Sequence, residues 1–295
     1  MVADIKIFVC CHQPTEIPNH PLLVPTQVGA ALADRHFPGF FYDDTDDNIS
    51  LKNRSYCELT AQYWAWKNIN ADYYGFFHYR RYLYPDFKVK RPYQIKKKPE
   101  LALLEELGYN DFSKLIQEYD LIIPIGENMH LSVQEHYANS SFHYKKDLDL
   151  TKQIVQEFFP EYTPALEEYF LGTISYFGNI FIMRKDIFYN YCSWLFSILN
   201  EFDKRVDISG YSLQEKRVDG YLAERLLGGY YTKNKHTFQV CELPRIHFEP
   251  NFQKMIKAKV INMIVPPSSN MRANIKRLAR IYRNQIDKKK LKIGR

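Results

Sequence analysis

Three ionisable side chains stand at the end of an apolar stretch in residues 75–82, the most unusual segment of the sequence. They are His78, Arg80 and Arg81. Such groups are rarely buried without partners, because removing a charge from water is costly. Arginine can bind a diphosphate through two parallel hydrogen bonds, and histidine can hydrogen-bond a phosphate or ligate a divalent ion. The segment therefore predicts a diphosphate site, with pairing of the arginines to nearby acids as the alternative.

Two acids in a helix predicted over residues 217–227 are the second candidates for chemistry. Asp219 lies near the helix start, where the helix dipole favours a carboxylate, and Glu224 lies within the helix. Either carboxylate could act as the general base that takes a proton from a sugar hydroxyl. The alternatives are that Asp219 only caps the helix and that Glu224 pairs with an arginine.

Metal-binding side chains are the third candidates. His247 follows the last predicted strand and could reach the edge that holds His78, so these histidines could ligate a metal ion; a structural role is the alternative. Five cysteines include no CxxC pair, so the sequence indicates neither a zinc site nor a disulfide framework. An acid-rich loop offers oxygens that Mg²⁺ or Mn²⁺ could bind, or forms a solvated turn: Asp43, Asp44, Asp46, Asp47 and Asn48.

Strands that alternate with helices must position these groups, and this order predicts an α/β fold around a sheet. The first strand, residues 5–11, leads into a polar loop, and ligands of such sheets often bind where strands end. A second strand is predicted over residues 72–84. Because side chains alternate along a strand, it would place His78 and Arg80 on one face and Arg81 on the other.

A helix is predicted over residues 55–68, where large side chains recur at spacings of three and four. Ser55 followed three residues later by Glu58 is the pattern of a capping box, in which each side chain bonds to the other residue's backbone amide. The sequence thus predicts a capping role for Glu58.

The composition is that of a globular protein with an aromatic excess. Of 295 residues, 45% are hydrophobic, 25% charged and 16% aromatic. Flat rings with polar tips suit the faces of sugars, and a tyrosine-rich core is the equal alternative. The start of the chain lacks a signal-peptide pattern, and no apolar run approaches the roughly 20 residues that cross a bilayer. We therefore expect a cytoplasmic protein that is neither secreted nor integral to the membrane.

Residues 251–295 form a basic tail with 13 Lys and Arg against one acid, whereas the rest of the chain holds 27 basic and 33 acidic residues. The linker Pro266-Pro267-Ser268-Ser269 precedes a predicted amphipathic helix over residues 272–287. We expect the tail to lie on the inner membrane surface, where anionic lipid attracts it. Nucleic acid is not an expected partner, because the tail lacks the aromatic-basic pattern of RNA-binding modules. The expected domains are 1–250 and 251–295.

Four blocks of sequence resemble a bacterial family catalogued as a domain of unknown function, DUF4422. The match extends over about residues 5–247, and its first block is long and contains two of the three tryptophans of the chain. The four blocks are Asp47-Asn48-Ile49-Ser50-x-Lys52-Asn53-x-x-Tyr56-x-Glu58-Leu59-Thr60-x-x-Tyr63-Trp64-x-Trp66-Lys67-Asn68, Gly75-x-x-His78-Tyr79-Arg80-Arg81-Tyr82, Asn179-Ile180-Phe181-Ile182-Met183 and Arg217-Val218-x-Gly220-Tyr221-Leu222-Ala223-Glu224-Arg225-Leu226.

The resemblance implies a glycosyltransferase of capsule, exopolysaccharide or O-antigen synthesis, with galactofuranosyl transfer in some members. The implied fold is a single GT-A-like nucleotide-sugar-binding domain with a mostly parallel central sheet, followed here by the basic helical tail. The expected reaction moves a hexose from a UDP-sugar to a lipid-linked glycan acceptor. A non-catalytic carbohydrate- or lipid-binding assembly protein is the rival class, and hydrolysis of a UDP-sugar would separate the two.

The resemblance also implies roles for single residues. Val28 and Gly29 would hold the nucleotide beside the first strand, and His78, Arg80 and Arg81 the diphosphate. Asp219 departs from the family pattern, which favours Glu224 as the base. The residues expected to shape the sugar and acceptor pockets are Asn179, Trp64 and Arg225, with a place in the core as the equal alternative for Trp64.

Metal dependence stays open. Many GT-A enzymes hold Mn²⁺ on the diphosphate with an Asp-x-Asp pair at a strand end. The comparable strand end here carries His78-Tyr79-Arg80-Arg81. Either Mn²⁺ or Mg²⁺ binds with the help of His78 and His247, or the arginines neutralise the diphosphate without a metal.

Overall fold

The first strand, β1 (Ile5–Cys11), lies in the middle of a sheet and is buried on both faces. Ile7 and Val9 belong to one apolar core, whereas Phe8 and Cys10 belong to the other. Strands buried on both faces are typical of sheets with helices on each side. The computed structural model describes residues 3–89, 91–265, 269, 271–272, 274–275 and 278.

The sheet has ten strands in the described part of the chain: β1, β2 (Leu23–Gln27), β3 (Phe41–Tyr42), β4 (Tyr73–His78), β5 (Arg81–Leu83), β6 (Tyr93–Lys96), β7 (Leu121–Pro124), β10 (Phe181–Arg184), β11 (Val240–Leu243) and β12 (Arg245–Phe248). The main order is β11-β7-β10-β4-β1-β2-β3, and β5 links the end of β4 to β12, which pairs with β6. Strands β1 to β4 pair in parallel, as do β7 and β11, whereas β10 is antiparallel to both neighbours. This mostly parallel α/β sheet confirms the predicted fold class.

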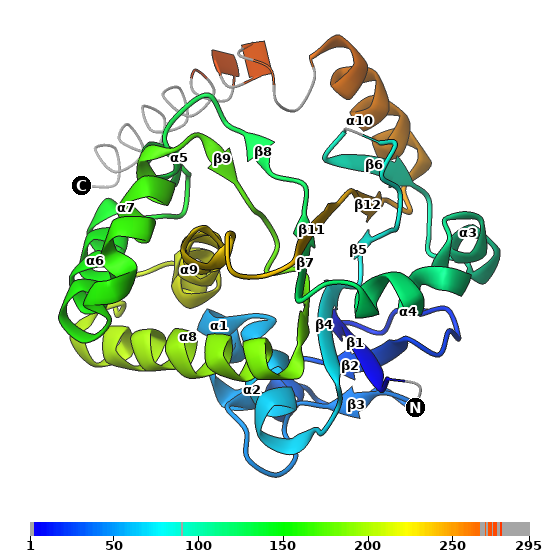
Figure 1. Ribbon diagram of the computed structural model, residues 1–295, viewed down its shortest axis with the longest axis horizontal. Coiled ribbons are helices and arrows are strands. Elements are labelled where there is room, and N and C mark those ends of the chain that lie inside the picture. The colour runs from blue at the N-terminus through cyan, green and yellow to red at the C-terminus, as the bar shows by residue number, and fades with distance from the viewer. Residues whose placement is uncertain are drawn as a thin grey trace, which may run out of the picture.

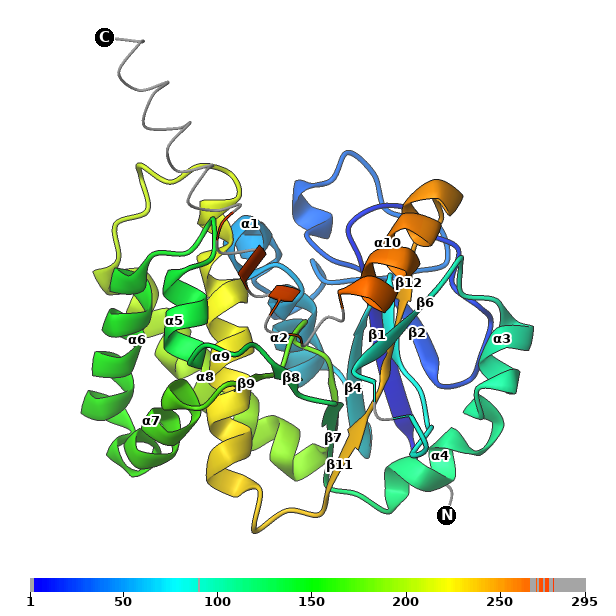
Figure 2. The ribbon, with the colours of Figure 1, turned by 90° about the horizontal axis from the view of Figure 1, so that it is seen from above.

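Helices cover both faces of the sheet (Figures 1 and 2). The larger layer holds α2, α8 and α9 with α5 to α7 outside them, and α3 and α4 lie on the other side. Two short strands, β8 (Glu127–Asn128) and β9 (Ile174–Ser175), form a separate ribbon. The helices are α1 (Asn53–Tyr56), α2 (Leu59–Asn68), α3 (Leu101–Glu106), α4 (Tyr109–Gln117), α5 (Val133–Ala138), α6 (Lys145–Phe158), α7 (Thr163–Leu171), α8 (Lys185–Arg205), α9 (Val218–Asn234) and α10 (Phe252–Ile264).

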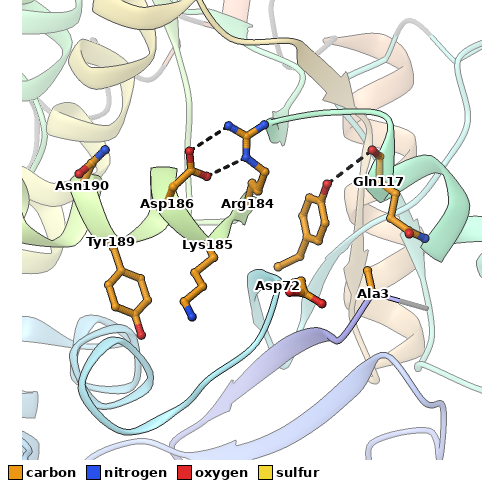
Figure 3. Close-up of a pocket in the computed structure, with 9 residues that line it drawn as sticks. Ala3, Asp72, Gln117, Arg184, Lys185, Asp186, Tyr189 and Asn190 are labelled. Atoms are coloured by element: carbon orange, nitrogen blue, oxygen red, sulfur yellow. Dashed lines mark hydrogen bonds and ion pairs between the residues drawn. The ribbon is translucent and has the colours of Figure 1, made fainter. Parts of the chain in front are cut away.

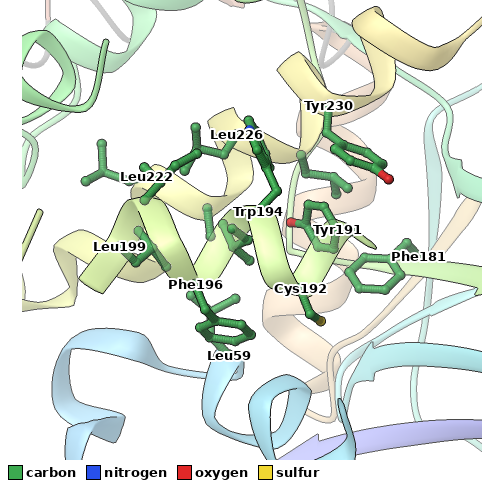
Figure 4. Close-up of a cluster of buried hydrophobic side chains, with 14 of the residues drawn as sticks. Leu59, Phe181, Tyr191, Cys192, Trp194, Phe196, Leu199, Leu222, Leu226 and Tyr230 are labelled. Atoms are coloured by element: carbon green, nitrogen blue, oxygen red, sulfur yellow. The ribbon is translucent and has the colours of Figure 1, made fainter. Parts of the chain in front are cut away.

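The larger core fixes α9 against α8 (Figure 4). Tyr191 and Trp194 of α8 meet Tyr230 of α9, with ring centroids 5.0 Å and 5.5 Å apart. Leu222 and Leu226 of α9 are fully buried in the same core. This packing matters for function because α9 also carries three of the predicted site residues, Asp219, Glu224 and Arg225.

A break at Cys57 divides the helix predicted over residues 55–68 into α1 and α2. Cys57 has φ 52° and ψ −129°, a conformation that side chains with a Cβ rarely adopt. The predicted capping box is wrong, because Glu58 makes no capping hydrogen bond and Ser55 bonds to a residue of another helix.

The strand predicted over residues 72–84 is two strands. The first, β4, ends at His78, and β5 starts at Arg81 after a tight turn. The predicted division of side chains between the faces is wrong, since alternation holds only within a continuous strand. His78 and Arg81 instead pair directly across the turn.

The C-terminal region contains α10, a helix that the sequence analysis did not predict. The helix predicted over residues 272–287 falls mostly outside the described residues, as does the Pro266-Pro267 linker; positions 271–272, 274–275 and 278 are helical. Within the described ranges, the chain has no helix long and apolar enough to cross a membrane.

Gly228 tests the close packing of α9 on α7. A Cβ there would lie 2.1 Å from Cζ of buried Tyr169. We expect Gly228→Ala to lower the free energy of unfolding by about 2 kcal/mol, because overpacking costs about 3 kcal/mol and the gain in helix propensity is about 1 kcal/mol. Urea unfolding measures this change. Gly210→Ala is the control, since nothing lies within 4 Å of a Cβ at that position. A Gly228→Ala protein as stable as the wild type would contradict the packing.

Candidate functional site

His78, Arg81 and His247 lie in one row across three neighbouring strands. His78 of β4 pairs with Arg81 of β5, and Arg81 pairs with His247 of β12. Directly paired residues carry their side chains on the same face of a sheet. Arg80 lies in the turn between β4 and β5, and its carbonyl accepts a hydrogen bond from the N–H of Phe248 at 2.8 Å. The structure thus brings together the four basic residues that the sequence singled out.

The histidines at this edge are uncharged at neutral pH. Burial, and then the positive charge of Arg81, hold the pKa of His78 down to about 2. Burial and neighbouring arginines likewise lower the pKa of His247 to about 2. His12, which follows β1, has its pKa lowered by burial and by Arg80. The positive charge of the edge therefore resides on arginines, and the neutral imidazoles can accept or donate hydrogen bonds.

Three arginines of this edge have no carboxylate in contact. Among the ion pairs within 4.0 Å that join described residues, none involves Arg80, Arg81 or Arg217. Arg217 donates a hydrogen bond from Nε to Sγ of Cys57 at 3.2 Å. Arg81 is partly buried, and burial lowers its pKa. A partly buried guanidinium without a carboxylate partner, as in Arg81, favours an anionic ligand, which replaces the hydration that it has lost.

The same side chains suit an anion better than a divalent cation. His78 and His247 could each ligate a metal, but Arg81 lies between them in the sheet and its charge repels a cation. In the ranges that the structure describes, no group of three or more His, Cys, Asp or Glu side chains is arranged to hold a metal ion.

Asp43 holds the turn that was predicted to bind the nucleotide. Its buried carboxylate accepts hydrogen bonds from the N–H groups of Gly29 (2.8 Å) and Ala30 (2.9 Å) and from Oγ of Ser50 (2.6 Å). Gly29 adopts φ 65°, and the N–H of Val28 bonds to the last carbonyl of β1 at 3.0 Å. Val28 and Gly29 thus follow β2 directly and lie beside the end of β1, whereas Asp43 of the acidic loop is held inside the protein.

A turn before β10 joins two helices at the strand edge. Gly178 (φ 98°) and Asn179 (φ 49°) are both left-handed. The N–H of Gly178 donates to Oε1 of Glu224 at 2.8 Å. Nδ2 of Asn179 donates to Oε1 of Glu58 at 2.8 Å and to the carbonyl of Gly220 at 3.1 Å, which settles the orientation of this buried amide. The turn therefore holds a carboxylate of the α1–α2 break and a carboxylate of α9.

Glu224 lies near this edge, and both of its oxygens accept hydrogen bonds. Oε2 accepts from Nη1 of Arg225 at 3.1 Å, and the negative charge of Glu224 acts on Arg81. The side chain of Arg225 is 2% exposed, and its guanidinium lies 5.2 Å from the ring centre of Phe177. The structure thus places Glu224 beside the arginines and Arg225 in the protein interior.

Two predicted residues lie away from the strand edge. Asp219 is 1% exposed and accepts a hydrogen bond from Oγ of Ser55. Burial, and then the charge of Asp203, raise the pKa of Asp219 to about 7. Trp64 is 4% exposed, and its ring packs edge-on against Phe8 of β1. Both side chains pack among helices and sheet, so the structure does not bring them to the cluster of arginines.

Sequence reasoning missed Glu58 and Arg217 as members of the site. Both lie in the family-like blocks, and this membership is the signal that could have found them. Glu58 was interpreted as a helix cap, because no sequence pattern indicates that Cys57 adopts a left-handed conformation. We use the name strand-edge cluster for eight residues: His12, His78, Arg80, Arg81, Arg217, His247, Glu58 and Glu224.

A surface hollow of about 680 Å³ lies at the opposite edge of the sheet (Figure 3). Tyr73 at the start of β4 and Arg184 at the end of antiparallel β10 line it. Arg184 pairs with Asp186 at 2.7 Å and also with Asp120. Because its arginine is already neutralised, this hollow lacks the unbalanced charge that marks the strand-edge cluster.

Known proteins show the same fold. A structure of WbbM, a bifunctional glycosyltransferase in its apo form, is similar to this chain with a TM-score of 0.79 and 33% sequence identity. The similarity covers 83% of this chain and 45% of the WbbM chain, so this chain spans less than half of that protein. A search of curated proteins found no significant match. The fold is thus similar to that of a glycosyltransferase.

The family model described as "Domain of unknown function (DUF4422)" matches residues 6–235. This range holds all four of the family-like blocks and every member of the strand-edge cluster except His247. The match covers more than half of the chain and confirms the resemblance seen in the sequence. The chain belongs to the DUF4422 family.

Proposed function

We propose that this chain is a glycosyltransferase that moves a hexose from a UDP-sugar to a lipid-linked glycan acceptor in surface polysaccharide synthesis. The strand-edge cluster carries this proposal, because unpaired arginines there lie beside two carboxylates at the carboxyl ends of parallel strands. The similarity to a bifunctional glycosyltransferase supports the reaction class. A nucleotide diphosphate is the anion that arginines bind in bidentate fashion, and a sugar attached to it would extend toward the carboxylates.

The arginines would act on the leaving group. As the bond between the anomeric carbon and the phosphate oxygen breaks, negative charge grows on the departing UDP. Guanidinium groups fixed at that position stabilise the transition state more than the ground state, which is what accelerates a reaction. Arg81 is held in β5 between two paired strands, so it needs little rearrangement to meet the diphosphate.

UDP release from a panel of UDP-sugars, with and without Mn²⁺, tests the transferase activity itself. Turnover with one donor would support an enzyme over the rival of a non-catalytic carbohydrate- or lipid-binding assembly protein. The strand end that carries an Asp-x-Asp pair in many GT-A enzymes carries arginines in this chain. We therefore expect turnover without added Mn²⁺. The absence of UDP release from every donor, with acceptor glycan present, would contradict the proposal.

Arg80→Ala tests the diphosphate role. The side chain of Arg80 is exposed, so its removal leaves the fold intact. We expect kcat/KM to fall about 100-fold or more, the loss typical when one donor to a developing negative charge is removed. Lys114→Ala, which removes a positive charge from exposed α4, is the control and should keep wild-type kinetics. Unchanged kcat/KM in Arg80→Ala would show that the guanidinium does not contact the donor.

Glu224→Gln tests the carboxylate beside Arg81. Glutamine keeps an oxygen for the N–H of Gly178 but loses the charge that orients Arg81. We expect kcat/KM to fall about 10- to 100-fold, which corresponds to a charged hydrogen bond of about 1.5–3 kcal/mol. Asp44→Asn in the acidic loop should have little effect in the same assay. The reverse order of the two variants would contradict this assignment.

We also propose that α10 and the basic tail attach the protein to the inner membrane surface. Met255 of α10 faces the protein, and Lys254 and Lys257 are exposed. The helix α10 starts four residues after Phe248, and the N–H of Phe248 bonds to the carbonyl of Arg80. Attachment of α10 to the membrane would therefore hold the transfer site next to a lipid-linked acceptor. Five exposed apolar side chains share about one third of the helix circumference: Phe252, Ile256, Val260, Met263 and Ile264.

Sedimentation of the full chain with vesicles tests the attachment. We expect the double variant Ile256→Asp, Met263→Asp to bind vesicles of anionic phosphatidylglycerol at least tenfold more weakly, because it places charge in the apolar stripe. Leu171→Asp, at an exposed site on α7, is the matched control. High salt should weaken wild-type binding, since each basic residue contributes about 1 kcal/mol at such a surface. Binding that ignores anionic lipid and salt would contradict the proposal.

A further inference from the structure

Strained backbone holds Glu58 at the strand edge. Cys57 and Asn179 are both left-handed residues that are not glycine, with φ 52° and 49°. Such conformations persist only where the surroundings enforce them, and they gather at functional sites. Here one hydrogen bond, from Nδ2 of Asn179 to Oε1 of Glu58, joins the two strained segments. The break at Cys57 turns Glu58 toward the arginines, since its negative charge acts on both Arg81 and Arg217.

Three carboxylates near the site differ in what they can still bind. Asp219 is 1% exposed and accepts a hydrogen bond from Oγ of Ser55. Glu224 already accepts a hydrogen bond at each oxygen, from Gly178 and from Arg225. Glu58 is partly exposed, and in the described part of the chain Asn179 is the one other residue that donates a hydrogen bond to it. Glu58 therefore has the carboxylate best able to accept a further hydrogen bond from a ligand.

The surroundings of Glu58 also suit proton transfer. Burial is the main cause that raises its pKa above the ordinary value of a glutamate, and the charge of Glu224 adds to it, while Asn179 and Arg217 oppose the shift. A base works best when its pKa approaches the working pH. Two cysteines are the other titratable neighbours of Glu58: Cys10 at the end of β1 and Cys57 at the break between α1 and α2. Both thiols have raised pKa values and are uncharged.

We propose that Glu58 is the base that accepts the proton of the acceptor hydroxyl. This assignment rests on the proposed glycosyl transfer. In one step, the acceptor oxygen forms a bond to the anomeric carbon, and the bond from that carbon to the phosphate oxygen breaks. UDP leaves with the bonding electron pair toward the arginines, and the hydroxyl proton moves to the carboxylate of Glu58. A single displacement of this kind inverts the configuration of the anomeric carbon.

Glu58→Gln tests the assignment without breaking the local structure, because the glutamine oxygen can still accept the hydrogen bond from Asn179. We expect kcat to fall about 10²- to 10⁴-fold, the contribution typical of a general base. The wild-type rate should decline as pH falls through the raised pKa of Glu58, since the base acts only when deprotonated. That acidic limb should persist in Asn179→Ala, shifted to higher pH because the amide that lowers the pKa of Glu58 is removed, and vanish in Glu58→Gln. Glu106→Gln, on exposed α3, should match the wild type.

Two further measurements separate a base from a structural role. Added formate should restore part of the activity of Glu58→Ala, because a small carboxylate can occupy the vacated space. NMR of the product should show an inverted anomeric configuration. Wild-type kcat in Glu58→Gln, or a retained configuration, would overturn the assignment while UDP release by the wild type upheld the transferase. If the wild type released no UDP from any donor, the proposed function itself would fall.

Discussion

The left-handed turn of Gly178 and Asn179 is the constraint on which the site depends. Its backbone and side-chain donors bond to Glu224 on α9 and to Glu58 at the break between α1 and α2. Gln62 of α2 adds a third link, with Nε2 bonded to the carbonyl of Asn179 at 3.3 Å. Two helices far apart in the sequence are thereby fixed to the start of β10. These hydrogen bonds offset the repulsion between the two like-charged carboxylates.

The turn places negative charge opposite a positive strand edge. Arg81 lies between two neutral histidines in adjacent strands, and the turn between β4 and β5 presents Arg80 beside it. The carboxylates act on Arg81 from a distance rather than in contact, so they orient it without neutralising it. A charge distribution of this kind suits a ligand with an anionic part and a hydroxyl-bearing part, as a nucleotide sugar has. The packing of α8, α9 and α7 keeps the acidic side of the site rigid.

The sequence predicted the basic half of the site better than the acidic half. His78, Arg80 and Arg81 stood out because charged residues follow an apolar strand, and strand ends meet at one edge in a parallel sheet. Glu58 did not stand out, since its spacing from Ser55 matched a capping box and the left-handed Cys57 between them leaves no sequence pattern. Asp219 was predicted as a site residue from its position near a helix start, and Trp64 from its family-like block with a core place as the alternative, but burial depends on tertiary packing that periodicity does not encode. The α/β fold was predictable because strands and helices alternate along the chain, whereas the pairing of β5 with β12 is a long-range contact.

We propose above all that the strand-edge arginines bind the diphosphate of a nucleotide. Calorimetric titration of the full chain with UDP and with uridine, at one salt concentration and without added metal, tests it most directly. The two ligands share the base and the ribose, so the ratio of their dissociation constants isolates the diphosphate. Charged hydrogen bonds of about 1.5–3 kcal/mol each predict that UDP binds about 100-fold more tightly than uridine, since every 1.4 kcal/mol is tenfold in affinity. Equal affinities for UDP and uridine would contradict the binding of the diphosphate by these arginines.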